Sequence, residues 1–148
     1  MEKEIRHASC VAVNGAGILI TGPSGSGKSD LALRLIDRGA KLISDDYVEL
    51  CRHDDQLLME APPQIAGKME VRSLGIFDCE HVSNIPLILQ VRLKPQIERF
   101  PMDSQTETIM TMSIPTITLN PAEASAPIKV EMALNRLLQQ PSQRPEGA

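Results

Sequence analysis

The sequence predicts an α/β fold, in which helices flank a mixed β-sheet. Three observations predict it. A short apolar run at 18–21 leads into a glycine-rich loop, and the loop opens an amphipathic helix. Turn-bounded pairs of strands follow that helix, which favours a mixed sheet over a purely parallel one. The length of 148 residues suits a single domain, placed at 1–140, and a polar tail at 141–148 is expected to be disordered.

Strands make up most of the expected elements. Each is a short apolar or alternating run bounded by glycine, proline, asparagine or aspartate, the residues that favour turns. Together they cover residues 9–13, 18–21, 41–43, 47–52, 57–60, 68–72, 86–93 and 116–119. The polar stretch 94–113 has no clear period, and we expect it to be a mobile loop.

Two helices are expected to flank the sheet. The first, at about 28–38, buries its leucines on one side and ends at Gly39, a residue that suits the left-handed position after a helix. The second, at about 126–138, carries an apolar stripe at helical spacing, which predicts packing against the core. Ser125 is its candidate N-cap.

Composition excludes several classes of protein. Aromatic residues are only 2% of the chain and the net charge is -4, so a nucleic-acid partner is not expected. The longest apolar run is strand-sized, well below the roughly 20 residues that span a bilayer, so no membrane partner is expected. The three cysteines form no CxxC pair, and the charged N-terminus lacks an apolar signal segment. We therefore expect reduced thiols in a cytoplasmic protein.

The glycine-rich loop matches the P-loop pattern GxxxxGK[ST]. Its residues are Gly22, Pro23, Ser24, Gly25, Ser26, Gly27, Lys28 and Ser29. Glycines let backbone N–H groups turn toward phosphate oxygens, and the helix that follows points its positive N-terminus at the same anion. Lys28 can reach the β and γ phosphates, and the Ser29 hydroxyl can bind Mg²⁺. The loop predicts ATP and Mg²⁺ as cofactors, because the strand before it and the helix after it disfavour a mere turn.

Three acidic residues further along the chain are candidates for the same site. Asp45 and Asp46 come just after 41–43, and ligands of open α/β sheets sit at the carboxyl ends of strands. One carboxylate could hold Mg²⁺ and the other could accept the proton of an attacking hydroxyl, whereas a solvated turn is the alternative. Glu70 and Arg72 share one face of strand 68–72, where they could meet the metal or form an exposed ion pair.

Taken in order, these motifs resemble the HPr kinase/phosphorylase family. His7, unremarkable by spacing alone, stands fifteen residues before Gly22, which is the interval of the family pattern. The Asp-Asp pair follows as it does in the family, and residues 69–76, Met-Glu-Val-Arg-Ser-Leu-Gly-Ile, are similar to the family signature. The resemblance covers roughly residues 6–138. More specifically, the chain resembles the short form of the family, which consists of the C-terminal catalytic domain alone.

The resemblance implies an ATP- and Mg²⁺-dependent serine kinase. Its substrate would be HPr, the phosphocarrier protein of the sugar phosphotransferase system. It also implies a fold similar to that of phosphoenolpyruvate carboxykinase and a homo-oligomer, since members of the family are often hexamers. Asp46 would be the catalytic base with Asp45 beside it. Ser29 and Glu70 would serve the metal, and His7 would lie near the transferred phosphoryl group.

The chain departs from the family pattern at places that bear on the reverse reaction. Ser73 replaces the first glycine of the signature, and a positive φ there would strain a serine. The long forms carry a Pro-Gly-Arg-Asn stretch tied to phosphorolysis of phosphoserine, whereas 115–121 holds neither glycine nor arginine here. They also carry an arginine in a mobile loop, and Arg99 is the only arginine of 94–113. These departures argue against phosphorylase activity and leave the kinase reaction.

Two other functions stay open at this point. A non-catalytic ATP-binding regulatory module would use the same loop, but a sensor needs no base such as Asp46. A small-molecule kinase usually closes a lid with several arginines over the phosphates. Between the signature and the last helix this chain has only Arg92 and Arg99, which disfavours that reading.

Overall fold

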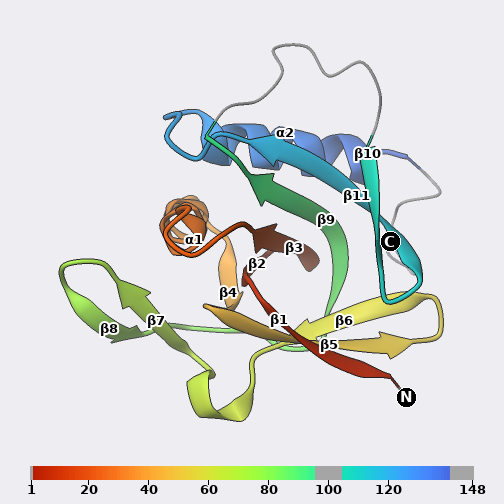
Figure 1. The fold of residues 1–148 in the computed structure, drawn as a ribbon, viewed down its shortest axis with the longest axis horizontal. Helices are drawn as coiled ribbons and strands as arrows, with labels where there is room; N and C mark the ends of the chain where they lie inside the picture. Colours follow the sequence, from red (N-terminus) through yellow and green to blue (C-terminus); the bar gives the residue numbers. More distant parts are fainter. Residues whose placement is uncertain (1, 96–104, 141–148) are drawn as a thin grey trace.

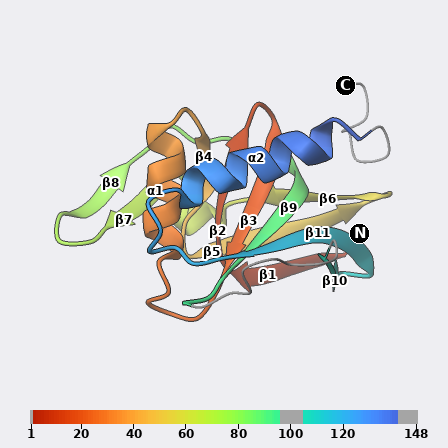
Figure 2. The same ribbon diagram turned by 90° about the horizontal axis from the view of Figure 1, so that it is seen from above.

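The computed structural model describes residues 2–95 and 105–140. Two helices cover one face of a curled mixed β-sheet, and a second layer of strands lies against its other face (Figures 1 and 2). The helices are α1 (Lys28–Asp37) and α2 (Ala126–Leu138). The strands are β1 (Lys3–His7), β2 (Ser9–Val13), β3 (Ala16–Thr21), β4 (Lys41–Ser44), β5 (Tyr47–His53), β6 (Gln56–Glu60), β7 (Lys68–Val71), β8 (Gly75–Asp78), β9 (Ile85–Leu93), β10 (Gln105–Ile109) and β11 (Met112–Leu119). The predicted fold class is confirmed.

The sheet is built around β3 and β9, which run parallel to each other. β11 extends it in parallel beyond β9, whereas β2 and β4 extend it in antiparallel fashion beyond β3. β6 pairs with β9 only at Leu58–Pro86 and Met59–Ile85, so the sheet turns there and β1, β5 and β6 form the second layer (Figure 1). β7 and β8 form a separate two-stranded hairpin that projects from the body (Figure 1).

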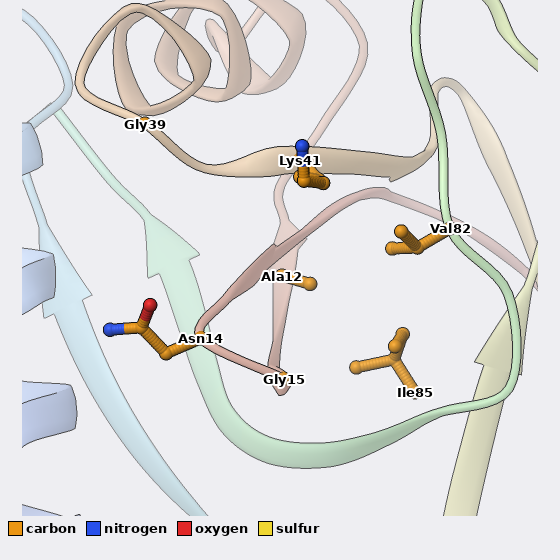
Figure 3. Close-up of a pocket in the computed structure, with 7 residues that line it drawn as sticks. All are labelled: Ala12, Asn14, Gly15, Gly39, Lys41, Val82 and Ile85. Carbon is orange, nitrogen blue, oxygen red and sulfur yellow. The ribbon is translucent and has the colours of Figure 1, made fainter.

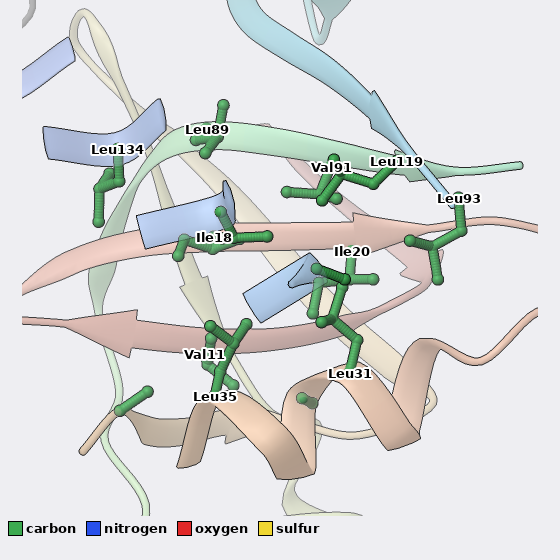
Figure 4. Packing of buried hydrophobic residues seen from close by; sticks show 14 of the residues in the cluster. Val11, Ile18, Ile20, Leu31, Leu35, Leu89, Val91, Leu93, Leu119 and Leu134 are labelled. Carbon is green, nitrogen blue, oxygen red and sulfur yellow. The ribbon is translucent and has the colours of Figure 1, made fainter. Parts of the chain in front are cut away.

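Two hydrophobic clusters hold the layers together. The first lies between the helices and the central sheet, where Ile18 and Ile20 of β3 pack with Leu31 of α1 (Figure 4). The second lies between the central sheet and the second layer and includes Leu19 and Met59. Because successive residues of a strand point to opposite faces, β3 is buried on both sides. Burial of such side chains contributes about 1.5–3 kcal/mol each, so the strand that carries the glycine-rich loop is held firmly.

Several sequence-based predictions need correction. The predicted loop 94–113 is wrong in its last part, which forms β10 and the start of β11, whereas 96–104 lies outside the described residues. β1 and β8 were not predicted, so His7 ends a strand rather than preceding the first one. Ser125 precedes α2 but makes no capping bond through its side chain. The tail 141–148 also lies outside the described residues.

Candidate active site

The loop between β3 and α1 has features that suit a bound phosphate. Gly27 precedes the helix at φ 102°, a left-handed conformation that favours glycine. Lys28 is only 7% exposed, and its Nζ donates to the carbonyl oxygens of Gly22 at 2.9 Å and Pro23 at 3.1 Å. These acceptors are neutral, and a negatively charged phosphate oxygen is a stronger acceptor for the same ammonium. The lysine is therefore held at the loop, ready to exchange carbonyls for phosphate.

Asp45 is the buried centre of the site. It is 5% exposed, and its Oδ1 accepts hydrogen bonds from Ser29 Oγ at 2.6 Å and from Ser9 Oγ at 2.9 Å. Its Oδ2 accepts a bond from the backbone N–H of Glu70 at 3.2 Å. The carboxylate thus joins the end of β4 to the first turn of α1, to β2 and to β7. Ser9 was missed by the sequence reasoning.

The donor set around Ser29 fits Mg²⁺. A hydroxyl and a carboxylate oxygen are the hard ligands that this ion prefers, and it usually takes one or two protein ligands beside phosphates and water. In the described part of the chain, no cluster of three or more His, Cys, Asp or Glu side chains could hold a metal without such help. Within the loop, Ser26 Oγ is buried and has no hydrogen-bond partner in the structure. A buried polar atom normally has such a partner, so a bound ligand would fit this position.

Asp46 points away from Asp45 and toward solvent. Its side chain is 63% exposed, and its Oδ1 lies 2.8 Å from Nε2 of His7. The His7 ring lies 5.1 Å from the ring of Tyr47, measured between centroids. The structure therefore brings together His7 and Asp46, two separately predicted site residues, and Tyr47 is an additional neighbour that the sequence reasoning did not identify.

A tight turn separates the two aspartates. Asp46 has φ 74°, and the N–H of Tyr47 donates to the carbonyl of Asp45 at 2.9 Å, which makes a three-residue γ-turn of the rare, strained kind. The N–H of Ala8 holds the Asp46 carbonyl at 2.9 Å, and Ser44 Oγ donates to the Tyr47 carbonyl. These bonds maintain a conformation that costs of order 1–3 kcal/mol.

The interval between His7 and Gly22 follows from a tight hairpin. β2 and β3 are joined by a two-residue turn, Asn14-Gly15, with Val13 paired to Ala16 and Ser9 paired to Ile20. Because Ser9 and Ile20 lie at the same end of this hairpin, the segments that lead to His7 and to Gly22 also start at that end. The same register could have identified Ser9 as a site residue. Its partner Ile20 faces α1, so the Ser9 hydroxyl lies on the same side of the sheet.

Glu70 meets the site through its backbone. Its N–H bonds Asp45, whereas the residue itself is exposed on β7. Arg72 does not share a strand face with Glu70 as expected, because β7 ends at Val71 and Arg72 enters the exposed turn before β8. The predicted role of the Glu70 carboxylate at the metal stays a prediction.

A separate hollow of about 270 Å³ lies at the opposite ends of the central strands (Figure 3). Its walls come from the β2–β3 turn, the end of α1 and the segment before β9. They consist of Ala12, Asn14, Gly15, Gly39, Lys41, Val82 and Ile85. The charged member, Lys41, pairs with Glu80 at 3.1 Å. The hollow lies at the Asn14-Gly15 end of β2 and β3, so it is no part of the phosphate site.

Comparison with known proteins gives one consistent result. The family model described as HPr Serine kinase C-terminal domain matches residues 1–143. The HPr kinase/phosphorylase of Chlorobium phaeobacteroides is 33% identical, over 90% of this chain and 44% of the relative. That of Lacticaseibacillus casei is 34% identical, over 80% of this chain and 41% of the relative. The solved Hpr(Ser) kinase/phosphatase of Coxiella burnetii is 28% identical with a TM-score of 0.78, over 90% of this chain and 95% of that chain. The chain thus spans less than half the length of these two curated relatives.

Proposed function

This chain belongs to the HPr serine kinase C-terminal domain family, and we propose that it is an ATP-dependent kinase that phosphorylates a serine of the phosphocarrier HPr. One observation carries the proposal. The P-loop serine Ser29 donates a hydrogen bond to the carboxylate of Asp45, whereas the adjacent carboxylate of Asp46 is exposed beside His7. Phosphoryl transfer to a hydroxyl needs both a metal-phosphate cradle and a separate base, and this arrangement supplies each from one turn.

Each group has a task that follows from its position. The loop amides and Lys28 bind the triphosphate, and Ser29 with Asp45 would hold Mg²⁺. When bound, that ion neutralises charge on the phosphate oxygens. Glu70 would support the metal through its bond to Asp45.

The chemistry requires one proton transfer. The serine oxygen forms a bond to the γ-phosphorus as the bond to the ADP oxygen breaks, and the hydroxyl proton passes to Asp46. His7 Nε2, 2.8 Å from Asp46 Oδ1, would orient the carboxylate and lie near the transferred group. A positioned base of this kind contributes typically 10²–10⁴-fold to the rate.

A transfer assay with a matched control tests the proposal. Purified chain is incubated with HPr, Mg²⁺ and ATP labelled in its γ-phosphoryl group, and label on serine is identified by mass spectrometry. Asp46→Asn should keep ATP binding and lose transfer by about 10²–10⁴-fold. Asp54→Asn is the control, since Asp54 is also an exposed aspartate at positive φ, 57°, but lies in the turn between β5 and β6.

The other outcomes separate the alternatives. ATP binding by the unmodified chain without label on any acceptor would indicate a regulatory module. Label on small hydroxyl compounds but never on HPr would indicate a small-molecule kinase. Unchanged transfer in Asp46→Asn would contradict the assignment of the base. Incubating phosphoserine-HPr with inorganic phosphate tests the reverse reaction, for which we expect no release.

We also propose a cytoplasmic homo-oligomer, with the hexamer among its possible states. The projecting β7–β8 hairpin supports a contact with another copy, because Leu74, Ile76 and Phe77 are 72%, 73% and 46% exposed. The three cysteines form no disulfide bond, which suits a reducing compartment. None of the helices in the described ranges is long and apolar enough to cross a membrane. Light scattering tests the oligomer, and a monomer at every concentration would contradict it.

A further inference from the structure

A network of polar side chains crosses the central strands where β3 ends. Thr21 Oγ1 donates to Gln90 Oε1 at 3.3 Å, and Gln90 Nε2 donates to Thr116 Oγ1 at 3.1 Å and to a carboxylate oxygen of Glu107. The same oxygen accepts a bond from Arg92 Nη2. Gln90 is only 2% exposed, whereas the side chains of Arg92 and Glu107 are 38% and 36% exposed. The network is therefore anchored in the interior and ends in a guanidinium group that ligands can reach.

Strand register places the backbone of Arg92 beside the start of the phosphate loop. Thr21 immediately precedes Gly22, and Arg92 is its partner on β9. On the other side of Thr21, the β2–β3 register continues to Ala8, the residue after His7. Neighbouring strands lie about 4.8 Å apart, so the backbones at Arg92 and Ala8 are about 10 Å apart with Thr21 between them.

Arg92 and the His7–Asp46 pair thus flank the start of the loop. Thr21 and Arg92 alternate with Ile20 and Val91, which face the helices, so both side chains leave the sheet on the face away from α1. Ala8 belongs to the hydrophobic cluster on that same face. In Figure 2, the green end of β9 and the red end of β1 both reach the lower edge of the molecule, where the loop before α1 also lies.

We propose that Arg92 is a further residue of the transfer site, whose guanidinium contacts the γ-phosphoryl group of ATP from the side opposite Asp46; this rests on the proposed kinase function. The negative charge of the transition state spreads over the phosphoryl oxygens, and an arginine is suited to bind it because its planar donors match such oxygens. Arginine has five N–H donors. The Glu107 bond uses Nη2, so the remaining donors can turn to phosphate while Glu107 keeps the group in place.

The charges around the loop favour this role. Asp45 and Asp46 bring two carboxylates to a site that must accept a polyanion. Lys28 supplies one cation at the loop, and Arg92 supplies a second from the adjacent strand. An exposed ion pair contributes little to stability. The stability of the fold therefore does not explain why a buried glutamine, Gln90, holds Glu107 and through it Arg92 in place. Arg99, the other arginine of this part of the chain, lies outside the described residues.

The experiment compares ATP with ADP. Affinities of both nucleotides with Mg²⁺ are measured by calorimetry, and kcat and KM for transfer to HPr are measured in parallel. In Arg92→Ala, a contact to the γ-phosphoryl group should weaken ATP at least tenfold relative to ADP and lower kcat by about 10²-fold or more. Arg92→Lys should restore part of kcat. Arg38→Ala is the matched control, because Arg38 forms a similarly exposed ion pair with Glu131 at 2.7 Å, far from the loop.

Each outcome decides the matter. An unchanged ATP-to-ADP affinity ratio together with an unchanged kcat would overturn the proposal. Equal weakening of both nucleotides together with a lower melting temperature would also overturn it, because that pattern indicates a structural role. Should Arg92→Ala fail to fold, Arg92→Lys decides by the same ratio. If the unmodified chain transfers nothing to HPr and yet Arg92→Ala weakens ATP selectively, the kinase proposal fails while the contact stands.

Discussion

Replacing Asp45 with asparagine changes one atom at the buried centre of the site. The carboxylate accepts bonds from Ser9, Ser29 and the N–H of Glu70. Asparagine offers one oxygen and one NH₂ group. Its NH₂ group must therefore face either the two serine hydroxyls or the backbone N–H of Glu70. The hydroxyls can rotate and accept, whereas the N–H cannot. We therefore expect the amide oxygen to face Glu70 and the NH₂ group to face the serines.

The magnitude follows from the loss of charge. A hydrogen bond to a charged group contributes about 1.5–3 kcal/mol and a neutral one about 0.5–1.5 kcal/mol, so three such exchanges cost about 3–4 kcal/mol. Removing a buried charge returns part of this through desolvation, which leaves a net loss of about 2 kcal/mol. For a domain of about this size, 1 kcal/mol shifts the melting temperature by about 2–4 °C, so a fall of about 4–8 °C is expected.

Thermal unfolding followed by circular dichroism measures this shift. Asp54→Asn is again the control, because it makes the same chemical change at an exposed turn. A second measurement adds Mg²⁺ and ATP, which should raise the melting temperature of the unmodified chain and of the control but hardly that of Asp45→Asn. A variant that matches the control in both measurements would refute the view that Asp45 is the shared partner of the loop and the metal.

Two further predictions concern the fold. Ser73, exposed at φ 74°, is strained by about 1–2 kcal/mol, and glycine costs about 0.5–1 kcal/mol in unfolded-chain entropy, so Ser73→Gly should stabilise by about 0.5–1 kcal/mol in denaturant unfolding; a destabilised variant would contradict the strain. Burial raises the pKa of the Cys10 thiol far above its ordinary range, so iodoacetamide at pH 8 should leave Cys10 unmodified in the native protein and modify it in guanidinium. Peptide mass spectrometry measures this, and native labelling of Cys10 would show that the strand opens.

The central elements could be predicted because their signals are local. The loop motif fixes the junction of β3 and α1, and α2 carries a helical stripe, so both helices appear where the sequence placed them. β10 gave no such signal, because it is polar and becomes a strand only by pairing with β11. Its turn, Met110-Thr111, has positive φ at both residues but lacks the asparagine or glycine that usually marks such a turn.

The candidate site was predicted in its members more than in its arrangement. The family is confirmed. The sequence predicts the loop, the aspartate pair and His7 as site residues, and their roles stay predictions. The sequence could not show that Asp45 turns inward and Asp46 outward, because the γ-turn that divides them has no residue signature here. Ser9 could have been found from the register of the Asn14-Gly15 hairpin, which sets it beside the end of β3.

The strained turn explains why the two aspartates can differ in role. The chain passes between the central sheet and the second layer twice near this point, from β1 to β2 at Ala8 and from β4 to β5 at Asp46. These two crossings are bonded to each other through the Ala8 N–H and the Asp46 carbonyl. The candidate base and its partner His7 thus lie where the two layers part. Glycine at position 46 would relieve the strain but remove the carboxylate, so the cost in stability is tied to the group that we propose as the base.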